Sequence, residues 1–575
     1  MTAAQPPPAE ARSRGGMPRL RRSLPWALLA ALLAWLVGYP LAITLVESLT
    51  APAAGAAAAD AGWSLAGFAE FAGRPDEWLA LWRTLWISAA TVVLAAAVGV
   101  PLGFVFERAE FPGRRLLGAL VALPVALPPL VGVIAFLFLY GESGFVSRGV
   151  QAALGLEEPP WRLIGGGAIL LVHAYSMYVY FYLFTRAALA RLDAALGEAA
   201  ASLGATPRRT LVRVTLPLLR PALAGATILT FMSALASFSA PYIFGGGFRV
   251  MTTQIVSSKL NGDLRMAQVE TVVLAAVALL GLGLLQRTNR PAGVAGAVRG
   301  VAPARRRIAS RGARTAAAVA GWGLAILLLL PHATVALISL VPPGTWTTEA
   351  LPPELSLGNY AAVFSEPERL RPVGNSLWMA VVATVAAVGL GFAAARGAVV
   401  RGGRLGKLLE SLISLPWAIP GTVFAVALAA TFSVDRPLAL RFLLIGTPVI
   451  LPLAYLLRNL PLTGRAALSG LGQLDPALEE AAASLGASRW RALRRVVVPL
   501  VRPALAAGAA LAFITALGDF VTSIVLYTFE TRPISMEIVA ALRLQELGVA
   551  GVYGVLLTAA GAAAFALYGR GEVAA

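Results

Sequence analysis

Long apolar stretches alternate with short polar segments along this chain of 575 residues. A helix that crosses a bilayer needs about 20 consecutive, mostly apolar residues, because every backbone N–H and C=O group must be paired within the protein. Twelve stretches are long enough, and they lie near residues 24–48, 85–106, 117–140, 163–185, 222–244, 269–286, 315–341, 376–395, 408–432, 442–457, 503–526 and 549–569. The pattern predicts an all-α polytopic membrane protein with about 12 transmembrane helices.

The second part of the chain repeats the first. The octet EAAASLGA stands at Glu198–Ala205 and again at Glu480–Ala487, and around it residues 197–223 align without a gap onto residues 479–505. Prolines recur at matched places in the third span of each set, namely Pro124, Pro128 and Pro129 and then Pro416 and Pro420. Each set holds six spans, so we expect two parallel six-span repeats about an axis along the membrane normal.

These features divide the chain into four predicted parts. They are a cytoplasmic N-terminal tail (1–23), a first transmembrane domain (24–286, the first half), a cytoplasmic linker (287–314) and a second transmembrane domain (315–575, the second half). The linker is rich in Gly, Ala, Pro and Arg, a composition that does not build a packed core.

The distribution of charge predicts an orientation. The chain carries a net charge of +18, although only 13% of its residues are charged. With the N-terminus inside, 34 of the 47 Lys and Arg face the cytoplasm and 13 lie in external loops. This is the positive-inside distribution, so both octets and both chain termini are predicted to be cytoplasmic. Because topology accounts for the excess charge, and because no folded basic module is recognisable, we expect no nucleic-acid partner.

The composition excludes several kinds of chemistry. The chain has no cysteine and only two histidines, His173 and His332, so thiolate sites and histidine metal clusters cannot form. Its two lysines, Lys259 and Lys407, are each followed by leucine, whereas a phosphate-binding P-loop needs Lys followed by Ser or Thr. We therefore expect no catalytic residue, no metal site and no cofactor in this chain.

Each octet predicts a short helix with an abrupt end. Glu198 and Glu480 suit the start of a helix, where the dipole favours a carboxylate. The alanines that follow have the highest helix propensity and little bulk. Gly204 and Gly486 suit the left-handed position just after a helix end.

Beyond each octet come arginines and then Leu216-Pro217 or Val498-Pro499. Proline is tolerated in the first turn of a helix, so these pairs indicate that a new helix re-enters the membrane. A short helix with a face of small residues can approach a groove on a soluble partner closely. The alternative is a cap below the bundle whose arginines touch lipid phosphates. The preservation of both copies in an otherwise diverged pair favours docking.

The octets and their flanks resemble a known motif. Residues Glu198, Ala199, Ala200, Gly204, Leu216 and Pro217 match the EAA loop of binding-protein-dependent ABC importer permeases, whose pattern is E-A-A, three residues, G, nine residues and I-x-L-P. The second copy matches with Val in place of Ile and Leu, at Glu480, Ala481, Ala482, Gly486, Val498 and Pro499. In that family the loop forms the helix that sits in a cleft of the ATPase subunit. Two loops in one chain resemble the fused permeases of the ferric-iron, thiamine and phosphonate group.

The resemblance implies partners and a location. It implies two copies of a separate ABC ATPase that binds the ATP, and an extracytoplasmic substrate-binding protein received by loops near 49–84 and 342–375. The chain would be a multi-pass protein of the bacterial inner membrane and would catalyse no covalent chemistry. Segments 236–255 and 518–538 are most similar to ferric-iron permeases, so ferric iron is the expected substrate, with thiamine, phosphonate, sulfate and polyamine as alternatives.

One carboxylate stands within an apolar stretch. Asp519, in FITALGDFVTSIVL, is costly in a membrane unless it is paired or faces water. Its counterpart 282 positions earlier is Ser237. We interpret the two as lining the translocation pathway, where they would favour a cationic or cation-escorting substrate. An Asp that is hydrogen-bonded between helices is the alternative.

Two other functions stay open. Six plus six parallel spans also describe secondary transporters. Ion-coupled carriers usually need intramembrane ionisable groups, and the candidates here are few: Glu47, His173, His332 and Asp519. A membrane scaffold or sensor that recruits an ATPase is the non-transport alternative.

Overall fold

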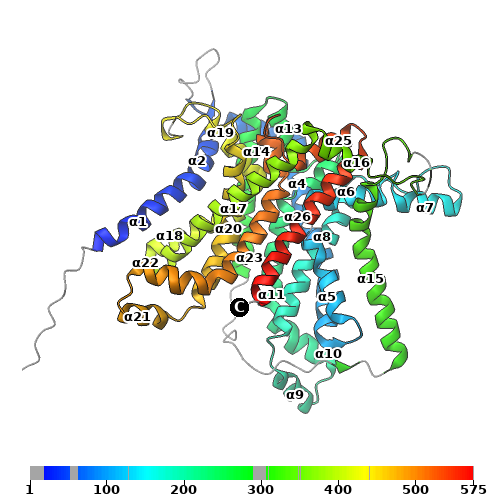
Figure 1. Ribbon diagram of the computed structural model, residues 1–575, viewed down its shortest axis with the longest axis horizontal. Helices are drawn as coiled ribbons and strands as arrows, with labels where there is room; N and C mark the ends of the chain where they lie inside the picture. Colours follow the sequence, from blue (N-terminus) through cyan, green and yellow to red (C-terminus); the bar gives the residue numbers. More distant parts are fainter. Residues whose placement is uncertain are drawn as a thin grey trace, which may run out of the picture.

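The computed structural model describes residues 19–51, 62–126, 128–288, 306–307, 310–346, 349, 351–439 and 441–573. Long helices stand side by side in one bundle (Figure 1). Among the described residues, ten helices are long and apolar enough to cross a membrane, and one bent pair makes an eleventh. The predicted all-α polytopic fold is confirmed. Residues 1–18 of the predicted tail, and 289–305 and 308–309 of the predicted linker, lie outside the described residues.

The elements up to the linker are α1 (Arg19–Leu33), η1 (Ala34–Gly38), α2 (Tyr39–Ser48), β1 (Thr50–Ala51), β2 (Gly62–Trp63), α3 (Ala66–Gly73), α4 (Pro75–Arg108), β3 (Ala109–Glu110), α5 (Arg114–Ala122), η3 (Leu123–Ala126), α6 (Pro129–Tyr140), α7 (Phe145–Leu154), α8 (Gly165–Leu189), α9 (Ala194–Ser202), α10 (Pro207–Thr210), η4 (Leu211–Thr215), α11 (Leu216–Leu235), α12 (Ser239–Phe244), α13 (Met251–Leu260) and α14 (Leu264–Thr288). The short strands pair β1 with β2 antiparallel, and β3 with β4 (Arg306–Arg307) parallel.

The remaining elements are α15 (Arg311–Ile338), α16 (Gly358–Ser365), α17 (Pro367–Arg401), α18 (Gly403–Ala418), α19 (Gly421–Phe432), η5 (Pro437–Ala439), α20 (Ile450–Gly472), α21 (Pro476–Ser484), α22 (Arg489–Ala492), η6 (Leu493–Val497), α23 (Val498–Leu517), α24 (Val521–Leu526), α25 (Ile534–Arg543) and α26 (Leu547–Val573).

The sequence repeat is also a repeat of local structure. α4 and α17 both begin with a proline in the first turn and end with an arginine in the last turn, where the helix dipole favours a positive charge. The backbone N–H of Met251 donates to Thr84 Oγ1 at 2.8 Å, and the N–H of Ile534 donates to Ser376 Oγ at the same distance. The start of α13 is thus tied to α4 in the same way as the start of α25 is tied to α17.

Glycines allow the closest helix contacts at matched positions. A Cβ atom on Gly99 of α4 would lie 2.3 Å from the carbonyl oxygen of Tyr178 in α8. A Cβ atom on Gly391 of α17 would lie 2.7 Å from Thr463 Oγ1 and 2.9 Å from the backbone nitrogen of Gly464 in α20. All three distances are too short for real atoms, so only glycine fits where these long helices touch.

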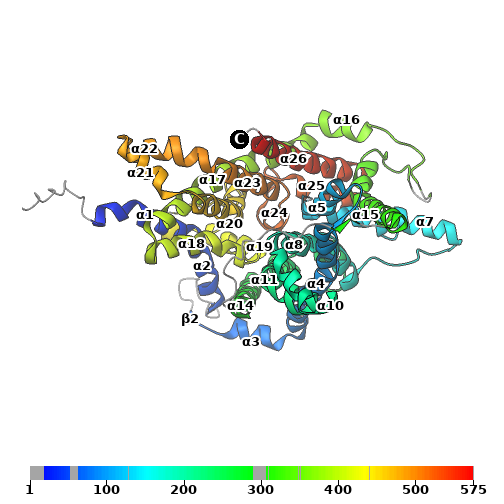
Figure 2. The same cartoon turned by 90° about the horizontal axis from the view of Figure 1, so that it is seen from below.

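The first helices of each half pack against the other half. α1 and α2 pack against α18 and α19 of the second half, while α15 packs against α5 and α6 of the first half (Figure 2). Trp35 Nε1 donates to the carbonyl of Leu438 at 2.7 Å, and the Tyr175 hydroxyl donates to the carbonyl of Leu328 at 2.8 Å. The halves are therefore interlocked as well as apposed.

The matched prolines break the third span in both halves. α18 and α19 are bent by 106° at a break that contains Pro420. In the first half, α5 passes through the 3₁₀ turn η3 to Pro128, and α6 then begins. Proline has no N–H and restricts the residue before it, so a continuous helix is disfavoured there.

Three predicted spans have the wrong limits. The spans predicted at 222–244 and 503–526 end at Leu235 and Leu517, and the short helices α12 and α24 follow as separate pieces. The tenth span, predicted at 442–457, is α20, which contains Arg458. The assignment of all 47 Lys and Arg to cytoplasmic segments and external loops is therefore wrong for Arg458, which can lie inside a helix because Asp519 neutralises it.

Candidate functional site

The repeated octets form two short helices, α9 and α21, that begin in the same way. The side chain of Asp193 accepts a hydrogen bond from the N–H of Ala195 (3.0 Å), and Asp475 accepts one from Ala477 (2.9 Å). An Asp at this position satisfies a helix N–H that has no partner within the helix. The expectation that Glu198 and Glu480 open these helices is therefore wrong, and both glutamates lie in mid-helix.

The two helices also end in the same way. Gly204 and Gly486 have φ values of 76° and 78°, and the residue after each donates back to an alanine carbonyl of the helix. This left-handed end was predicted and is confirmed. Directly before each glycine stands a leucine, Leu203 or Leu485, whose side chain is 88% or 89% exposed. Each half therefore presents an uncovered apolar side chain at the end of its short helix.

Both helices are open to a partner. Neither α9 nor α21 contains a buried residue. The side chains of Glu198, Ala199, Glu480 and Ala481 are exposed, while Ala200 and Ala482 are half-buried. Figure 1 shows α9 and α21 at the end of the bundle opposite to α13 and α25. We call α9 and α21 the coupling helices and this end the coupling side, after the role that the resemblance implies. Two matched surfaces on one side suit two matched grooves on soluble partners.

The prolines that follow the octets do not begin new helices. Helix runs without interruption from Pro207 to Leu235 and from Arg489 to Leu517. A turn of π-helix, η4 or η6, comes directly before Leu216-Pro217 and Val498-Pro499. A proline ring collides with the carbonyl four residues back, and the wider π turn gives it room. The predicted new helix is present in each half, but it begins at Pro207 and Arg489, ten residues before the predicted proline.

One ion pair distinguishes the two coupling helices. Arg396, near the end of α17, donates two hydrogen bonds to the carboxylate of Glu479 in α21, at 2.7 and 2.5 Å. The residue that corresponds to Glu479 in the first half is Gly197, which has no side chain. Only the second coupling helix can therefore be tied to a membrane helix in this way.

Asp519 is held by polar groups at the break between α23 and α24. Its carboxylate accepts from the Arg458 guanidinium of α20 at 2.5 Å. It also accepts from the N–H (2.9 Å) and the hydroxyl (2.5 Å) of Thr522. The Asp519 side chain is 2% exposed and that of Arg458 is 27% exposed. The charge of Asp519 is thus balanced inside the protein, as a carboxylate in an apolar environment requires.

Ser237 lies at the equivalent break between α11 and α12. His173 Nε2 of α8 lies 2.8 Å from its hydroxyl oxygen, and His173 Nδ1 lies 3.0 Å from Thr91 Oγ1. His173 and Tyr455 are 282 positions apart, and the Tyr455 hydroxyl lies 2.7 Å from Ser523 Oγ in α24, just after the break. In each half a polar side chain of the matched helix, α8 or α20, therefore contacts a serine at or just after the break. The pathway role of Ser237 and Asp519 stays a prediction.

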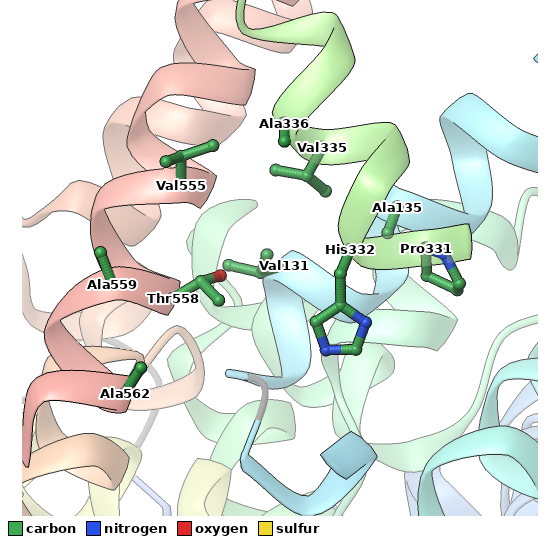
Figure 3. Close-up of a pocket in the computed structure, with 10 residues that line it drawn as sticks. All are labelled: Val131, Ala135, Pro331, His332, Val335, Ala336, Val555, Thr558, Ala559 and Ala562. Atoms are coloured by element: carbon green, nitrogen blue, oxygen red, sulfur yellow. The ribbon is translucent and has the colours of Figure 1, made fainter. Parts of the chain in front are cut away.

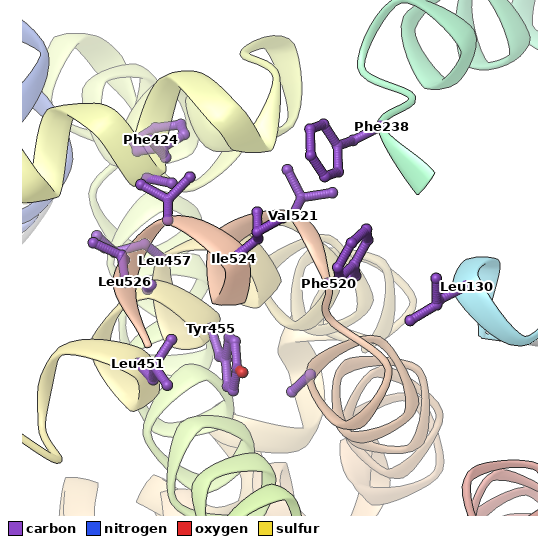
Figure 4. Packing of buried hydrophobic residues seen from close by; sticks show 14 of the residues in the cluster. Leu130, Phe238, Phe424, Leu451, Tyr455, Leu457, Phe520, Val521, Ile524 and Leu526 are labelled. Atoms are coloured by element: carbon purple, nitrogen blue, oxygen red, sulfur yellow. The ribbon is translucent and has the colours of Figure 1, made fainter. Parts of the chain in front are cut away.

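The residues next to Ser237 and Asp519 meet between the halves. The rings of Phe238 and Phe520, which are also 282 positions apart, have centroids 5.3 Å from each other. Tyr242 lies against both rings, at 5.2 and 5.4 Å. Figure 4 shows Phe238 and Phe520 facing each other from different halves, with Leu130 close by. Phe238 and Phe520 are 1% and 2% exposed, so this contact is buried between the halves.

Two basic side chains tie the same elements across the halves. Lys259, at the end of α13, donates to the carbonyl of Val525 in α24 at 2.8 Å. Arg543, at the end of α25, donates to the hydroxyl of Tyr242 in α12 at 2.5 Å. Each half thus reaches over to the short helix of the other half, on the side opposite to the coupling helices.

His332 lines an apolar cavity instead of a polar relay. The cavity, of about 220 Å³, lies between α6, α15 and α26 (Figure 3). Apart from His332 and Thr558, it is lined by Ala, Val and Pro side chains. Both ring nitrogens of His332 are buried without a hydrogen-bond partner. Glu47, another candidate, is paired with Arg436 and accepts from Gln268. These surroundings do not form the chain of ionisable groups that an ion-coupled carrier uses.

Sequence reasoning missed several residues of these sites. Leu203 and Leu485 lie within the octets themselves, and Asp193 and Asp475, and Phe238 and Phe520, recur at the same spacing of 282, so a closer comparison of the repeats could have identified all of them. Arg458 has no such signal, since Ser176 occupies its place in the first half.

Comparison with known proteins agrees with this arrangement. Residues 99–287 and residues 387–569 each match the family model of the binding-protein-dependent transport system inner membrane component. The chain is 33% identical over 464 residues to the probable ABC transporter permease protein y4fN of Sinorhizobium fredii, which covers 80% of this chain and 81% of that protein.

Two further relatives differ in the substrate that their names state. The chain is 28% identical over 452 residues to the ferric transport system permease protein FbpB of Actinobacillus pleuropneumoniae, which covers 76% of this chain but 62% of that protein. It is 32% identical over 215 residues to the molybdenum transport system permease protein ModB of Mycobacterium bovis, which covers 36% of this chain and 80% of that protein.

Proposed function

This chain belongs to the family of binding-protein-dependent transport system inner membrane components, as a fused permease with two copies of the family domain, and we propose that it carries ferric iron. It is a multi-pass inner membrane protein that works as the permease of an ABC importer, together with an ATPase and a substrate-binding protein. The observation that carries the mechanism is the pair of matched, uncovered helices α9 and α21.

The proposed mechanism couples two ATPase subunits to the two halves. α9 and α21, with the chain termini, lie in the cytoplasm, and each helix sits in a groove of one ATPase subunit. Leu203 and Leu485 supply the apolar part of that contact, since an exposed leucine gains free energy when a groove covers it. ATP binding draws the two subunits together, and each coupling helix moves with its own half. The two halves then rock against each other, which gives alternating access.

The aromatic contact between Phe238 and Phe520 serves as the outer gate in this mechanism. It lies between the halves, on elements that follow breaks in α11 and α23 and can therefore move separately from the long helices. Ser237 and Asp519 stand directly beside it. The substrate passes when the rings separate, and the polar residues beside them then line the opening.

Ferric iron is supported by resemblance and by the names of relatives. Segments 236–255 and 518–538, which carry the gate, resemble those of ferric-iron permeases, and relatives named for ferric transport align with about three quarters of this chain. The alternatives are thiamine, phosphonate, sulfate and polyamine. Because Arg458 neutralises Asp519, discrimination between substrates rests with the binding protein more than with this carboxylate.

The test is uptake of labelled Fe³⁺ by vesicles that contain this chain with its ATPase and binding protein. We expect ATP-dependent accumulation of iron. The double variant Glu198→Arg and Glu480→Arg should lose uptake and co-purification of the ATPase, because both docking surfaces change charge. Glu158→Arg, an exposed glutamate outside the coupling helices, is the control and should keep both. Intact ATPase co-purification and uptake in the double variant would exclude docking through these helices.

A further inference from the structure

A cluster of buried oxygen atoms lies where α4, α13 and α14 meet, away from the coupling helices. Glu77, in the first turn of α4, is 1% exposed, and Glu270, in α14, is 0% exposed. Gln254 of α13 is 8% exposed. The carboxyl groups of Glu77 and Glu270 lie within hydrogen-bonding reach of each other. Two acidic side chains from different helices are thus buried together.

Three oxygen atoms of this cluster have no donor. Ser258 Oγ donates to Glu270 Oε1 at 2.7 Å, and Gln254 Nε2 donates to Glu77 Oε1 at 3.0 Å. These contacts satisfy one oxygen of each carboxylate. The other oxygens, Glu77 Oε2 and Glu270 Oε2, and also Gln254 Oε1, are buried without a hydrogen-bond partner. Buried polar atoms almost always have a partner, so three such oxygens together indicate a positively charged ligand.

The described basic side chains nearby do not pair with Glu77 or Glu270. Arg74 pairs with Glu70 and lies 3.8 Å from Asp263, and neither Glu77 nor Glu270 forms a salt bridge within the described part of the chain. Arg265 of α14 lies against Gly67 of α3, where its Nε and Nη2 are buried without a hydrogen-bond partner, and it is not among the groups that act on Glu270. The charged groups that act on Glu270 are Glu77 and Asp263, which are both acidic.

In the second half, an arginine of the chain supplies the positive charge at the equivalent place. Arg369 stands where the first half has Glu77, and it donates to both carboxylate oxygens of Glu546 at 2.8 and 3.0 Å. Tyr553 replaces Glu270 and donates to the carbonyl of Arg369, while Glu537 replaces Gln254 and pairs with Arg532. The second half has a built-in cation where the first half has two carboxylates.

We propose that Glu77, Glu270 and Gln254 bind a hard divalent cation of the Ca²⁺ type. All the available ligands are carboxylate, amide or hydroxyl oxygens, which Ca²⁺ prefers, and the site is buried, whereas Mg²⁺ usually keeps several waters. A divalent charge balances both carboxylates, and one ion contacts all three unpartnered oxygens. A proton shared between the carboxyl groups satisfies only two of them and leaves Gln254 Oε1 unpaired. The ion fastens α4, α13 and α14 together on the side opposite to the coupling helices.

The experiment uses the full chain in detergent after removal of metals with a chelator. Addition of Ca²⁺ should raise the Tm by several degrees in a saturable manner, and about one Ca²⁺ should bind per chain at equilibrium, because the ion binds the folded state alone. Glu270→Gln keeps the shape of the side chain but removes one charge. This variant should bind no Ca²⁺ and should show the same Tm with and without it.

A matched control tests whether the effect is local. Glu537→Gln, at the place of Gln254 in the second half, should keep the Ca²⁺ response. Two results overturn the proposal: a wild-type Tm that is the same with Ca²⁺ and with chelator, or a Glu270→Gln variant that still binds Ca²⁺. If neither the wild type nor Glu270→Gln binds Ca²⁺, and the two are equally stable, the carboxyl groups of Glu77 and Glu270 share a proton instead.

Discussion

Gly391 shows how a single missing side chain controls the contact between two long helices. A methyl group there would meet Thr463 Oγ1 and the backbone of Gly464, which cannot move without shifting α20. We expect Gly391→Ala to lower the free energy of unfolding by an amount near the upper end of the roughly 1–3 kcal/mol that overpacking costs. Thermal unfolding in detergent measures this loss.

Gly389 is the matched control on the same helix. A Cβ atom at Gly389 would have no neighbour within 4 Å, and its surface is exposed. Gly389→Ala should therefore be neutral or gain up to about 1 kcal/mol from the higher helix propensity of alanine. Equal unfolding temperatures for the two variants would show that the close contact does not limit stability.

The sequence identified single residues only where a local rule applied. Asp519 stood out because a carboxylate is unusual in an apolar stretch, and the structure shows the expected compensation. Its partner Arg458 was not predicted, because it lies 61 positions away and the apolar pattern placed it just outside a span. Glu77 also lies outside the predicted spans, whereas Glu270 lies inside the one predicted at 269–286 and was not singled out; the two come together only when α4 packs near α14.

At the scale of elements, the long helices could be predicted well and their ends less well. Apolar length fixes the core of each span, but the starts of the spans that contain α11 and α23 depend on the π turns before Pro217 and Pro499, which let the helix continue through these prolines. The pattern merged α11 with α12 and α23 with α24, since apolar residues continue across both breaks. Contacts that form in the folded protein, such as the polar contacts of Ser237 and Asp519, stabilise these breaks.

The coupling helix α21 provides a prediction at this scale. Glu479 pairs with Arg396 of α17, and both side chains are partly buried, with exposures of 34% and 18%. Glu479→Gln should weaken this tether by about 1 kcal/mol, the upper value for a partly exposed ion pair. We expect uptake to fall several-fold while the ATPase still co-purifies, because the docking surface is unchanged.

The double variant Arg396→Gln and Glu479→Gln tests whether the two residues act together. The effects of substitutions at two residues in direct contact are not additive. Uptake by the double variant should therefore be no lower than uptake by whichever of the two single variants transports less. Additive losses in uptake would mean that each side chain acts through another contact.

At the scale of the whole molecule, the repeat predicted two similar halves but not how they interlock. Two parallel six-span domains can sit side by side with all their helices on their own side. Instead, α1 and α2 lie on the second half, and α15 lies on the first. This exchange depends on contacts between apolar surfaces that face neither water nor a polar partner, and the apolar pattern does not distinguish such a surface from one that faces lipid.

The contact between Phe238 and Phe520 gives the prediction that involves both halves at once. The chain has no cysteine, so the pair Phe238→Cys and Phe520→Cys introduces the only two thiols. With ring centroids 5.3 Å apart in the wild type, a short bifunctional thiol reagent should join them in the resting state. Peptide mass spectrometry detects the link.

Because the linked halves cannot separate at this level, uptake should stop, and it should return when a cleavable linker is reduced. Each single-cysteine variant should react without loss of uptake beyond its own substitution. Trapping the ATPase with nucleotide before the reagent is added should lower the yield, since the rings separate when the coupling helices move together. Full uptake by the cross-linked protein would mean that the substrate crosses elsewhere.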